Sequence, residues 1–421
     1  MGASNFVKNP GQRKKRQFSL KGLALKIDLP LLITVILLLI IGLIMVYSSS
    51  MQYAVLIDTD KPAALFQKQV IFVIGGLVVG FVAYRFDYHW LKPLAPYIMG
   101  SIIVLLIIVL MLPVTENEPK RTLFGGSVQP SELAKVVVII YLSVWIGQKK
   151  DQLNLLASGI IPMILILSTI CVLIMLQPDN SAMLTILFLG ILLFVIGEGN
   201  VRLIIPVVIF SLVIFGIAYF TSGTIQSRLD GYFASMNSMN TLDYHIQQSL
   251  SAIIRGGWFG TNLGEGTAKY IGLPVPWTDS IFAVILEELG FFGGAFIVFL
   301  YLVILFRGFK IAEDAPDLTG KLLASGLTSW IVFEAFINMG VMVRLFPVAG
   351  NALPLISYGG SMMVTTLGSL GLIFSVNRSV IEKQVGDERR SLDAAVDLRG
   401  RNGRGRVPRV NRSKRTRKFP T

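Results

Sequence analysis

The sequence predicts an all-α protein that crosses a membrane about ten times and carries one large loop between the seventh and eighth crossings. Composition is the first indication, because 53% of the 421 residues are hydrophobic and only 15% are charged. Soluble domains usually carry about 25% charged residues. The second indication is a series of apolar windows of about 20 residues, enough to cross a hydrocarbon core about 30 Å thick. The third is the crowding of basic residues at both ends of a chain of net charge +13.

The expected crossings are ten apolar windows, near residues 30–49, 67–85, 96–113, 133–148, 157–176, 182–197, 202–221, 279–306, 322–343 and 355–377. The sixth window is short, and the stretch "QPDNS" that joins it to the fifth is tight, so this pair could instead form one re-entrant unit. The first window is too long for the apolar part of a signal peptide, and no small-residue cleavage site follows it cleanly. We therefore expect a retained first helix.

The windows divide the chain into a basic N-terminal tail (1–28), a membrane domain (29–377) and a basic C-terminal tail (378–421). The end of the chain, "RGRNGRGRVPRVNRSKRTRK", cannot bury a core, so we expect a disordered cytoplasmic tail and no nucleic-acid partner. An arm that binds RNA or anionic phospholipid is the alternative. The single cysteine, Cys171, lies in an apolar window and has no partner for an intrachain disulfide.

The charges of the loops predict the orientation in the membrane. Most of the connecting Lys and Arg residues, which we place in the cytoplasm with both tails, lie in the loops 85–92, 147–152 and 307–321. An even number of crossings also puts both tails on one side. The acidic or mixed loops, which we place outside, are 58–63 and 115–121. The long loop, 222–278, then also lies outside, and Asp279 stands at the outer boundary between membrane and water.

Three carboxylates, Asp279, Glu287 and Glu288, lie in the eighth window, where an ionised group costs roughly 2.5–3.5 kcal/mol on insertion scales. In a straight helix the two glutamates would lie about 12–13.5 Å deeper than Asp279, close to the bilayer midplane. Neighbouring residues turn by about 100°, so at least one glutamate needs a separate partner inside the bundle. Hydrogen bonding that fixes helix packing and a proton-coupled role are both open for the pair. For Asp279 the residues alone favour a helix cap over catalysis.

Three further polar clusters lie at the outer ends of predicted crossings, on the same side as Asp279. In "VQPSELAK", Glu132 and Lys135 are three residues apart and should pair on one helix face. The turn "QPDNS" adds a carboxylate, and the glycines and hydroxyls of "LPLISYGGS" fit close helix packing or ligand contact equally well. Together the clusters predict a polar cavity open to the exterior, and its other candidate residues are Gln129, Ser131, Asp179, Ser357, Gly359 and Gly360.

The long loop contains the glycine-rich stretch "AIIRGGWFGTNLGEGTAKY" (252–270). A nucleotide site is not indicated, because no strand–turn–helix pattern surrounds the glycines and the Walker pattern is absent. We expect these glycines to let the backbone approach a bulky ligand or fold tightly over the cavity.

Taken together, the ordered segments resemble the SEDS family (shape, elongation, division and sporulation) of bacterial peptidoglycan polymerases. The resemblance runs from the first crossing to the tenth and is carried by "GLIMVYSSS", "QPSELAK", "QPD", "QQSLSAI", "GGWFG", "LGEGTAK", "TDSIFAVILEELG", "FINMGV" and "LPLISYGGS". The segments "MVYSSS", "KYIGLP" and "FINMGV" are more similar to the division branch of the family, FtsW, than to the elongation branch, RodA, which is the alternative.

The resemblance implies an enzyme that polymerises lipid II on the outer face of the bacterial cytoplasmic membrane, at the division septum. Asp279 corresponds to the essential aspartate of the family and is the expected general base of an inverting glycosyl transfer, in which undecaprenyl pyrophosphate leaves. Glu132 and Lys135 correspond to the Glu and Lys of the fourth-crossing motif. Lys135, a divalent cation (Mg²⁺ or Mn²⁺) or both would stabilise the leaving group. No metal ligands can be named from the sequence.

The resemblance also implies partners and exposes departures. Lipid II, the undecaprenyl-linked glycan, a class B penicillin-binding protein that crosslinks the product and other division proteins are the expected partners. The family usually has Gly where this chain has Asn262 and Arg344. Asn adopts the left-handed conformation readily. Arg344 brings a charge to the outer mouth of the cavity, where we expect it to pair with a carboxylate or bind pyrophosphate.

Two other classes of function stay open at this point. Carboxylates within crossings are also features of secondary transporters, so a lipid II flippase is the main alternative. Against it, the halves of the chain show no inverted repeat, and the polar clusters gather outside rather than around a central site. The third reading is a scaffold that only recruits division proteins, for which Asp279 would be dispensable.

Overall fold

The computed structural model describes residues 27–56, 63–112, 128–199, 204–237 and 243–402, and no strand occurs in these ranges. The described helices are α1 (Leu29–Leu56), α2 (Ala64–Arg85), α3 (Leu91–Met111), α4 (Pro130–Gln148), α5 (Ile161–Met175), α6 (Asn180–Ile196), α7 (Ile204–Thr221), α8 (Gly223–Asn237), α9 (Tyr244–Gly256), α10 (Ile281–Glu313), α11 (Leu318–Met342) and α12 (Gly360–Asn402). The prediction of an all-α membrane protein is confirmed.

Each predicted window corresponds to one helix of the bundle. Eight described helices are long and apolar enough to cross a membrane, and a ninth crossing results if α7 and α8, bent by 95° at residue 222, count as one broken span. The remaining window is α6, an apolar helix of 17 residues that follows α5 after a short turn and packs against it. At 1.5 Å per residue α6 is about 26 Å long, close to the thickness of a hydrocarbon core.

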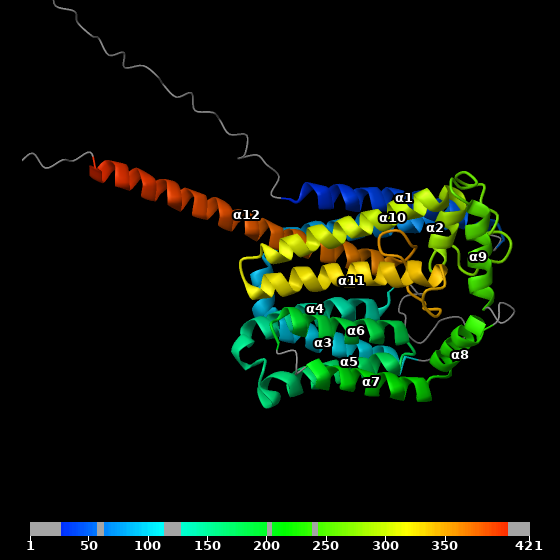
Figure 1. Cartoon of the computed structure of the whole chain (residues 1–421), viewed down its shortest axis with the longest axis horizontal. Coiled ribbons are helices and arrows are strands. Elements are labelled where there is room, and N and C mark those ends of the chain that lie inside the picture. The colour runs from blue at the N-terminus through cyan, green and yellow to red at the C-terminus, as the bar shows by residue number, and fades with distance from the viewer. Residues whose placement is uncertain (1–26, 57–62, 113–127, 200–203, 238–242, 403–421) are drawn as a thin grey trace, which may run out of the picture.

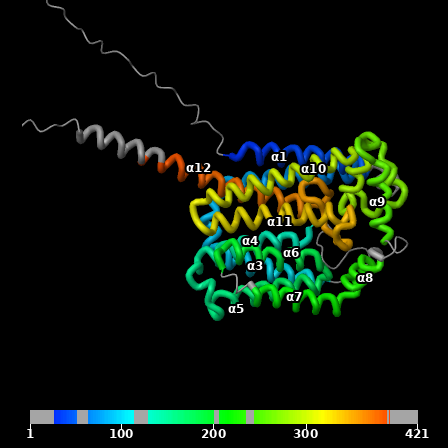
Figure 2. The backbone as a smooth tube through the Cα atoms, viewed as in Figure 1, coloured from blue at the N-terminus to red at the C-terminus, as the bar shows by residue number. Residues whose placement is uncertain are grey.

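The long helices lie side by side in one bundle with two distinct ends (Figure 1). At one end, which we call the loop end, lie α8, α9 and the segment 343–359, and at the opposite end, the tail end, α1 begins and α12 leaves the bundle (Figure 2). The most extensive packing joins α12 to α2 and α10 to α11. Small residues bring the first pair close together, and the Gly80 carbonyl lies against Gly371.

The last helix corrects the predicted domain boundary. The disordered tail was expected from residue 378, but α12 continues from Gly360 to Asn402. The reason is local composition: residues 378–399 contain no proline and only one glycine, Gly386, and are rich in strong helix formers. The Gly- and Arg-rich composition that argued for disorder begins only near the end of this helix. Residues 1–26 and 403–421, the rest of the two predicted tails, lie outside the described residues.

The predicted eighth crossing is confirmed as a candidate span, Ile281–Glu313, but α10 is two helices merged across a break. Gly290 has φ of +70°, which interrupts the helix after Leu289. A side chain at Gly290 would collide with the backbone of the loop, since a built Cβ would lie 2.4 Å from the Gly260 nitrogen. Phe291–Glu313 alone is about 34 Å long and suffices to cross a membrane. Ile281–Leu289 is therefore a separate short helix at the loop end.

Candidate functional site

A polar cavity of about 430 Å³ opens at the loop end of the bundle. Five of the predicted site residues line it, namely Gln129, Glu132, Asp279, Gly359 and Gly360. Tyr358 and Ser361, two of the hydroxyls of "LPLISYGGS", line it as well, together with Lys68 and Thr278, which the sequence did not indicate. The cavity therefore lies between the beginnings of α4 and α6, the second turn of α2, the segment that precedes α10, and the segment 350–359 with the beginning of α12. It joins parts of the chain that are far apart in sequence.

The backbone around Asp279 is held in place by buried polar groups. The Asn338 amide nitrogen donates to the Asp279 carbonyl (2.8 Å) and to the Asn351 carbonyl (2.6 Å). The Ser357 hydroxyl donates to the Thr278 carbonyl (2.7 Å). Ser357 was predicted to contact the substrate, but it is buried and is not among the residues that line the cavity. Its hydroxyl instead supports the turn that contains Asp279. The half-buried carboxylate of Asp279 is thereby presented at the cavity wall.

A histidine of α9 contacts the residue next to Asp279. The His245 Nε2 atom lies 2.6 Å from the Ser280 hydroxyl, which also lies 2.5 Å from the Pro274 carbonyl. Burial lowers the pKa of His245 below its ordinary value, while the nearby charges of Asp279 and Asp243 act in the opposite direction. This contact could not be predicted from sequence spacing, because the two residues lie 35 positions apart.

The predicted pair of Glu132 and Lys135 is confirmed and is part of a larger cluster. The Lys135 ammonium lies 2.8 Å from Glu132 and also forms an ion pair with Glu334 of α11, which the sequence analysis missed. Lys135 is only 2% exposed and does not line the cavity, whereas Glu132 does. A buried ammonium needs partners of opposite charge. Lys135 therefore pairs with two carboxylates, one of which, Glu132, lines the cavity.

Asp179 and Ser131 lie behind the cavity wall and support it. The Asp179 carboxylate accepts hydrogen bonds from Gln129 Nε2 and from the Ser131 hydroxyl, both at 2.6 Å. It also caps α6 by accepting from the Ala182 nitrogen (3.3 Å). The hydrogen bond between Asp179 and Ser131 joins the starts of α4 and α6. Both residues were predicted to line the cavity, but they are buried and are not among its lining residues.

Arg344 lies in a different place from the one predicted. It lines a separate small cavity with Arg228, Asp243 and Tyr232, and it is not among the residues that line the Asp279 cavity. Its φ of +61° and that of Asn262, +83°, are both left-handed. This conformation favours glycine, which explains why the family pattern has Gly at both positions. Arg344 extends from a backbone turn toward α8 and α9.

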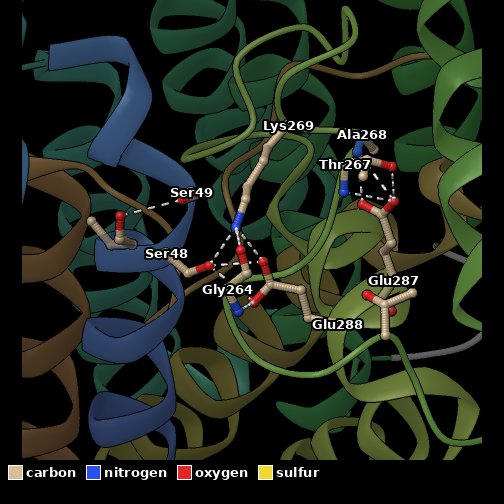
Figure 3. Close-up of polar contacts among 10 residues, drawn as sticks. Ser48, Ser49, Gly264, Thr267, Ala268, Lys269, Glu287 and Glu288 are labelled. Atoms are coloured by element: carbon tan, nitrogen blue, oxygen red, sulfur yellow. Dashed lines mark hydrogen bonds and ion pairs between the residues drawn. The ribbon is translucent and has the colours of Figure 1, made fainter. Parts of the chain in front are cut away.

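Glu288, a carboxylate in an apolar helix, is enclosed by partners from the loop and from α1 (Figure 3). Its carboxylate accepts from Lys269 Nζ (2.6 Å), the Ser48 hydroxyl (2.7 Å) and the Gly264 nitrogen (3.0 Å). The side chains of Lys269 and Glu288 are both almost completely buried. A fully hydrogen-bonded ion pair of this kind compensates for the burial of both charges.

Glu287 points to the other side and binds the same loop (Figure 3). It accepts hydrogen bonds from the backbone nitrogens of Thr267 (3.1 Å) and Ala268 (3.0 Å), and from the Thr267 hydroxyl (3.1 Å). The expectation that at least one of the two glutamates has a partner of its own is confirmed, and in the structure each of them has its own set. Their depth near the bilayer midplane stays a prediction; in the structure both precede the break at Gly290 and are hydrogen-bonded by the loop. Together they fasten residues 264–269 to the bundle.

These features define a class: a polytopic helical membrane protein whose loop folds back over one end of the bundle beside a polar cavity lined by carboxylates. Comparison with known proteins identifies the family. The family model for cell cycle proteins of the FtsW/RodA/SpoVE type matches residues 29–382, so the chain belongs to this family.

Relatives and solved structures cover most of the chain. It is 33% identical to a probable peptidoglycan glycosyltransferase FtsW of Trichlorobacter lovleyi, over 83% of this chain and 93% of that protein. It is 34% identical to stage V sporulation protein E of Bacillus subtilis, over 83% and 97%. A chain from a peptidoglycan synthase complex superposes with a TM-score of 0.67 at 25% identity (84% and 98% covered). Thermus thermophilus RodA superposes with a TM-score of 0.61, also at 25% identity (84% and 98% covered).

The described part of the chain contains no preformed set of ligands for the expected divalent cation. Glu132 and Asp279 both line the cavity, but no group of three or more His, Cys, Asp or Glu side chains that could hold a metal occurs among the described residues. Mg²⁺ usually keeps several waters and binds proteins through one or two carboxylates together with substrate phosphates. A bound divalent cation therefore stays a prediction.

Proposed function

We propose that this protein is a peptidoglycan glycosyltransferase that polymerises lipid II into glycan strands. The observation that carries the proposal is the Asp279 carboxylate, fixed at the wall of a polar cavity at one end of a membrane-spanning bundle. A substrate with a polyprenyl tail can keep that tail in the lipid while its sugars enter such a cavity. Membership of the FtsW/RodA/SpoVE family and the names of the relatives support the same reaction.

In the proposed reaction, the 4-hydroxyl of an incoming lipid II attacks the anomeric carbon of the growing strand. Asp279 accepts the hydroxyl proton as the new C–O bond forms, a service worth typically 10²–10⁴-fold in rate. The bond between the anomeric carbon and the diphosphate oxygen breaks, and undecaprenyl diphosphate leaves with the electron pair. Attack from the face opposite the leaving group inverts the anomeric configuration.

The reaction requires the loop end to face the outside of the bacterial cytoplasmic membrane. The basic residues at the tail end, among them Arg85, Lys149 and Arg307, favour the cytoplasm for that end. The division septum is the proposed location, by similarity to the FtsW relatives. A transpeptidase partner is proposed because a similar chain occurs in a peptidoglycan synthase complex in which polymerization and crosslinking are coordinated. Other division proteins are further proposed partners.

The test is polymerisation of lipid II by purified protein in the presence of a divalent cation, with and without the transpeptidase. Asp279→Asn preserves the size of the side chain and removes the base, so glycan product should fall at least about a hundredfold. Glu265→Gln is the matched control, because Glu265 is an exposed carboxylate of the same loop. Unchanged polymer from Asp279→Asn would reject the proposal, and translocation of lipid II without polymer would favour the flippase.

A further inference from the structure

The Asp279 cavity is lined by carboxylates, which would repel the diphosphate of the proposed substrate, and Lys135 does not face the cavity to compensate for them. A diphosphate group entering the cavity meets the carboxylates of Glu132 and Asp279, both of which line it. Lys135 was expected to compensate, but it is buried under Glu132 and Glu334. Like charges brought together in a partly desolvated site repel strongly. A cavity that accepts a diphosphate therefore needs a positive group that faces it.

Lys68 of α2 is such a group. It is exposed, it lines the cavity, and it forms no ion pair or hydrogen bond with any residue that the structure describes. Phe72, one helical turn further along α2, lines the same cavity, so this face of the helix is directed toward it. Among the described lining residues Lys68 is the one with a basic side chain.

The position of Lys68 is fixed by its neighbour, Gln69. The buried Gln69 amide donates to the Ser357 carbonyl (3.1 Å), and its oxygen accepts from the Gly359 nitrogen (3.3 Å). These bonds join α2 to the segment that also supports Thr278, through the Ser357 hydroxyl. Lys68 and the Asp279 turn are thus anchored to the same short segment, which sets their separation across the cavity. The lysine stem remains flexible enough to follow a moving anion.

We propose that Lys68 is the binding residue for the diphosphate of the polyprenyl-linked substrate. This inference rests on the proposed function and names the group that holds the leaving half of the substrate. When the bond to the anomeric carbon breaks, the diphosphate gains one negative charge, and an ammonium in contact with it stabilises that charge. Lys135 keeps a structural role, holding Glu132 at the cavity wall.

Binding to the full-length protein in lipid nanodiscs tests the assignment without requiring turnover. The probes are undecaprenyl diphosphate, undecaprenyl monophosphate and undecaprenol, each titrated against a background of anionic phospholipid. Lys68→Met retains the length of the side chain and removes the charge, so undecaprenyl diphosphate should bind about tenfold or more weakly, while undecaprenol binding stays unchanged. Lys68→Arg should restore most of the affinity. Lys310→Met, at an exposed lysine of the tail end, is the matched control.

The outcomes separate this inference from the proposed function. Equal affinity of wild type and Lys68→Met for undecaprenyl diphosphate overturns the role of Lys68, whatever Asp279 does. A loss that is the same for undecaprenol indicates a general disturbance of the cavity and also overturns it. Retained polymerisation by Asp279→Asn rejects the proposed function, yet a selective loss of diphosphate binding in Lys68→Met would still support the anion site. Thermal unfolding of each variant shows whether it is folded.

Discussion

The imidazole of His245 lies 2.6 Å from the hydroxyl of Ser280, the residue that follows Asp279 in the chain. A serine hydroxyl has one proton, and that proton is used in the 2.5 Å bond to the Pro274 carbonyl. The hydroxyl must therefore accept from His245, which places the imidazole proton on Nε2. Helix α9 is in this way tied to the turn that presents Asp279.

This geometry predicts a pH dependence that belongs to His245. Burial lowers the pKa of the imidazole, with a smaller contribution from Arg228, while Asp279 and Asp243 act to raise it. The unfolded chain therefore binds a proton near pH 6.5, before the folded protein does, so stability falls as the pH drops below about 6.5. His245→Gln keeps a side-chain N–H donor and does not titrate. Its midpoint of thermal unfolding between pH 7 and pH 5 should fall less than that of the wild type.

His89 supplies the control for this experiment, because the chain contains only two histidines and His89 lies at the tail end. The acid response of His245→Gln is therefore compared with that of His89→Gln as well as with that of the wild type. If the His245→Gln and wild-type unfolding curves respond to pH identically, the imidazole of His245 is not the group responsible.

The pair of Lys269 and Glu288 predicts a large effect of a single substitution. Lys269→Met leaves the Glu288 carboxylate buried without its cation, which typically destabilises a protein by about 3–5 kcal/mol. The double variant Lys269→Met/Glu288→Gln removes both charges and should recover part of that loss. Unfolding in detergent micelles measures the stability, and proteolysis of the loop reports whether residues 264–269 have come free.

An exposed pair provides the comparison. Lys150 and Glu198 form an ion pair at 2.7 Å with both side chains at least half exposed, so Lys150→Met should have little effect. Equal behaviour of the two lysine variants would mean that the Lys269 pair is not the buried clamp described above.

The sequence was sufficient for the crossings, the loop and the pairing of Glu132 with Lys135, because these depend on local composition and on helical spacing. Asp279 at the cavity wall also followed from its place at the end of the loop. Other features depend on contacts across the fold. Glu334 is 199 positions from Lys135, and Ser48 is 240 positions from Glu288, so no spacing rule could pair them.

The break at Gly290 shows a different limit. A single glycine within an apolar run is compatible with a straight helix, and only the approach of Gly260 to the same point reveals why the backbone turns there. The sequence therefore predicted one straight helix where the structure has two helical segments. Lys68 was missed for a similar reason, because a lone lysine at the start of a crossing usually marks only the membrane surface.

The cluster of Lys135 with Glu132 and Glu334 predicts a ranking of variants by their loss of stability. Lys135→Met leaves two carboxylates facing each other in a buried site and should be the most damaging change, at about 3–5 kcal/mol. Glu334→Gln leaves Lys135 with one carboxylate and an amide that can still accept a hydrogen bond, so the loss should stay within about 1 kcal/mol.

The double variant Lys135→Met/Glu334→Gln should be more stable than Lys135→Met alone, since one of the two stranded carboxylates is gone. Unfolding midpoints of the three variants in the same detergent provide the comparison. A double variant that is less stable than Lys135→Met would show that Glu334 stabilises the bundle through other contacts. Binding of undecaprenyl diphosphate should change little in Glu334→Gln, because in this arrangement the cavity cation is Lys68 and the buried lysine serves only to hold Glu132 in position.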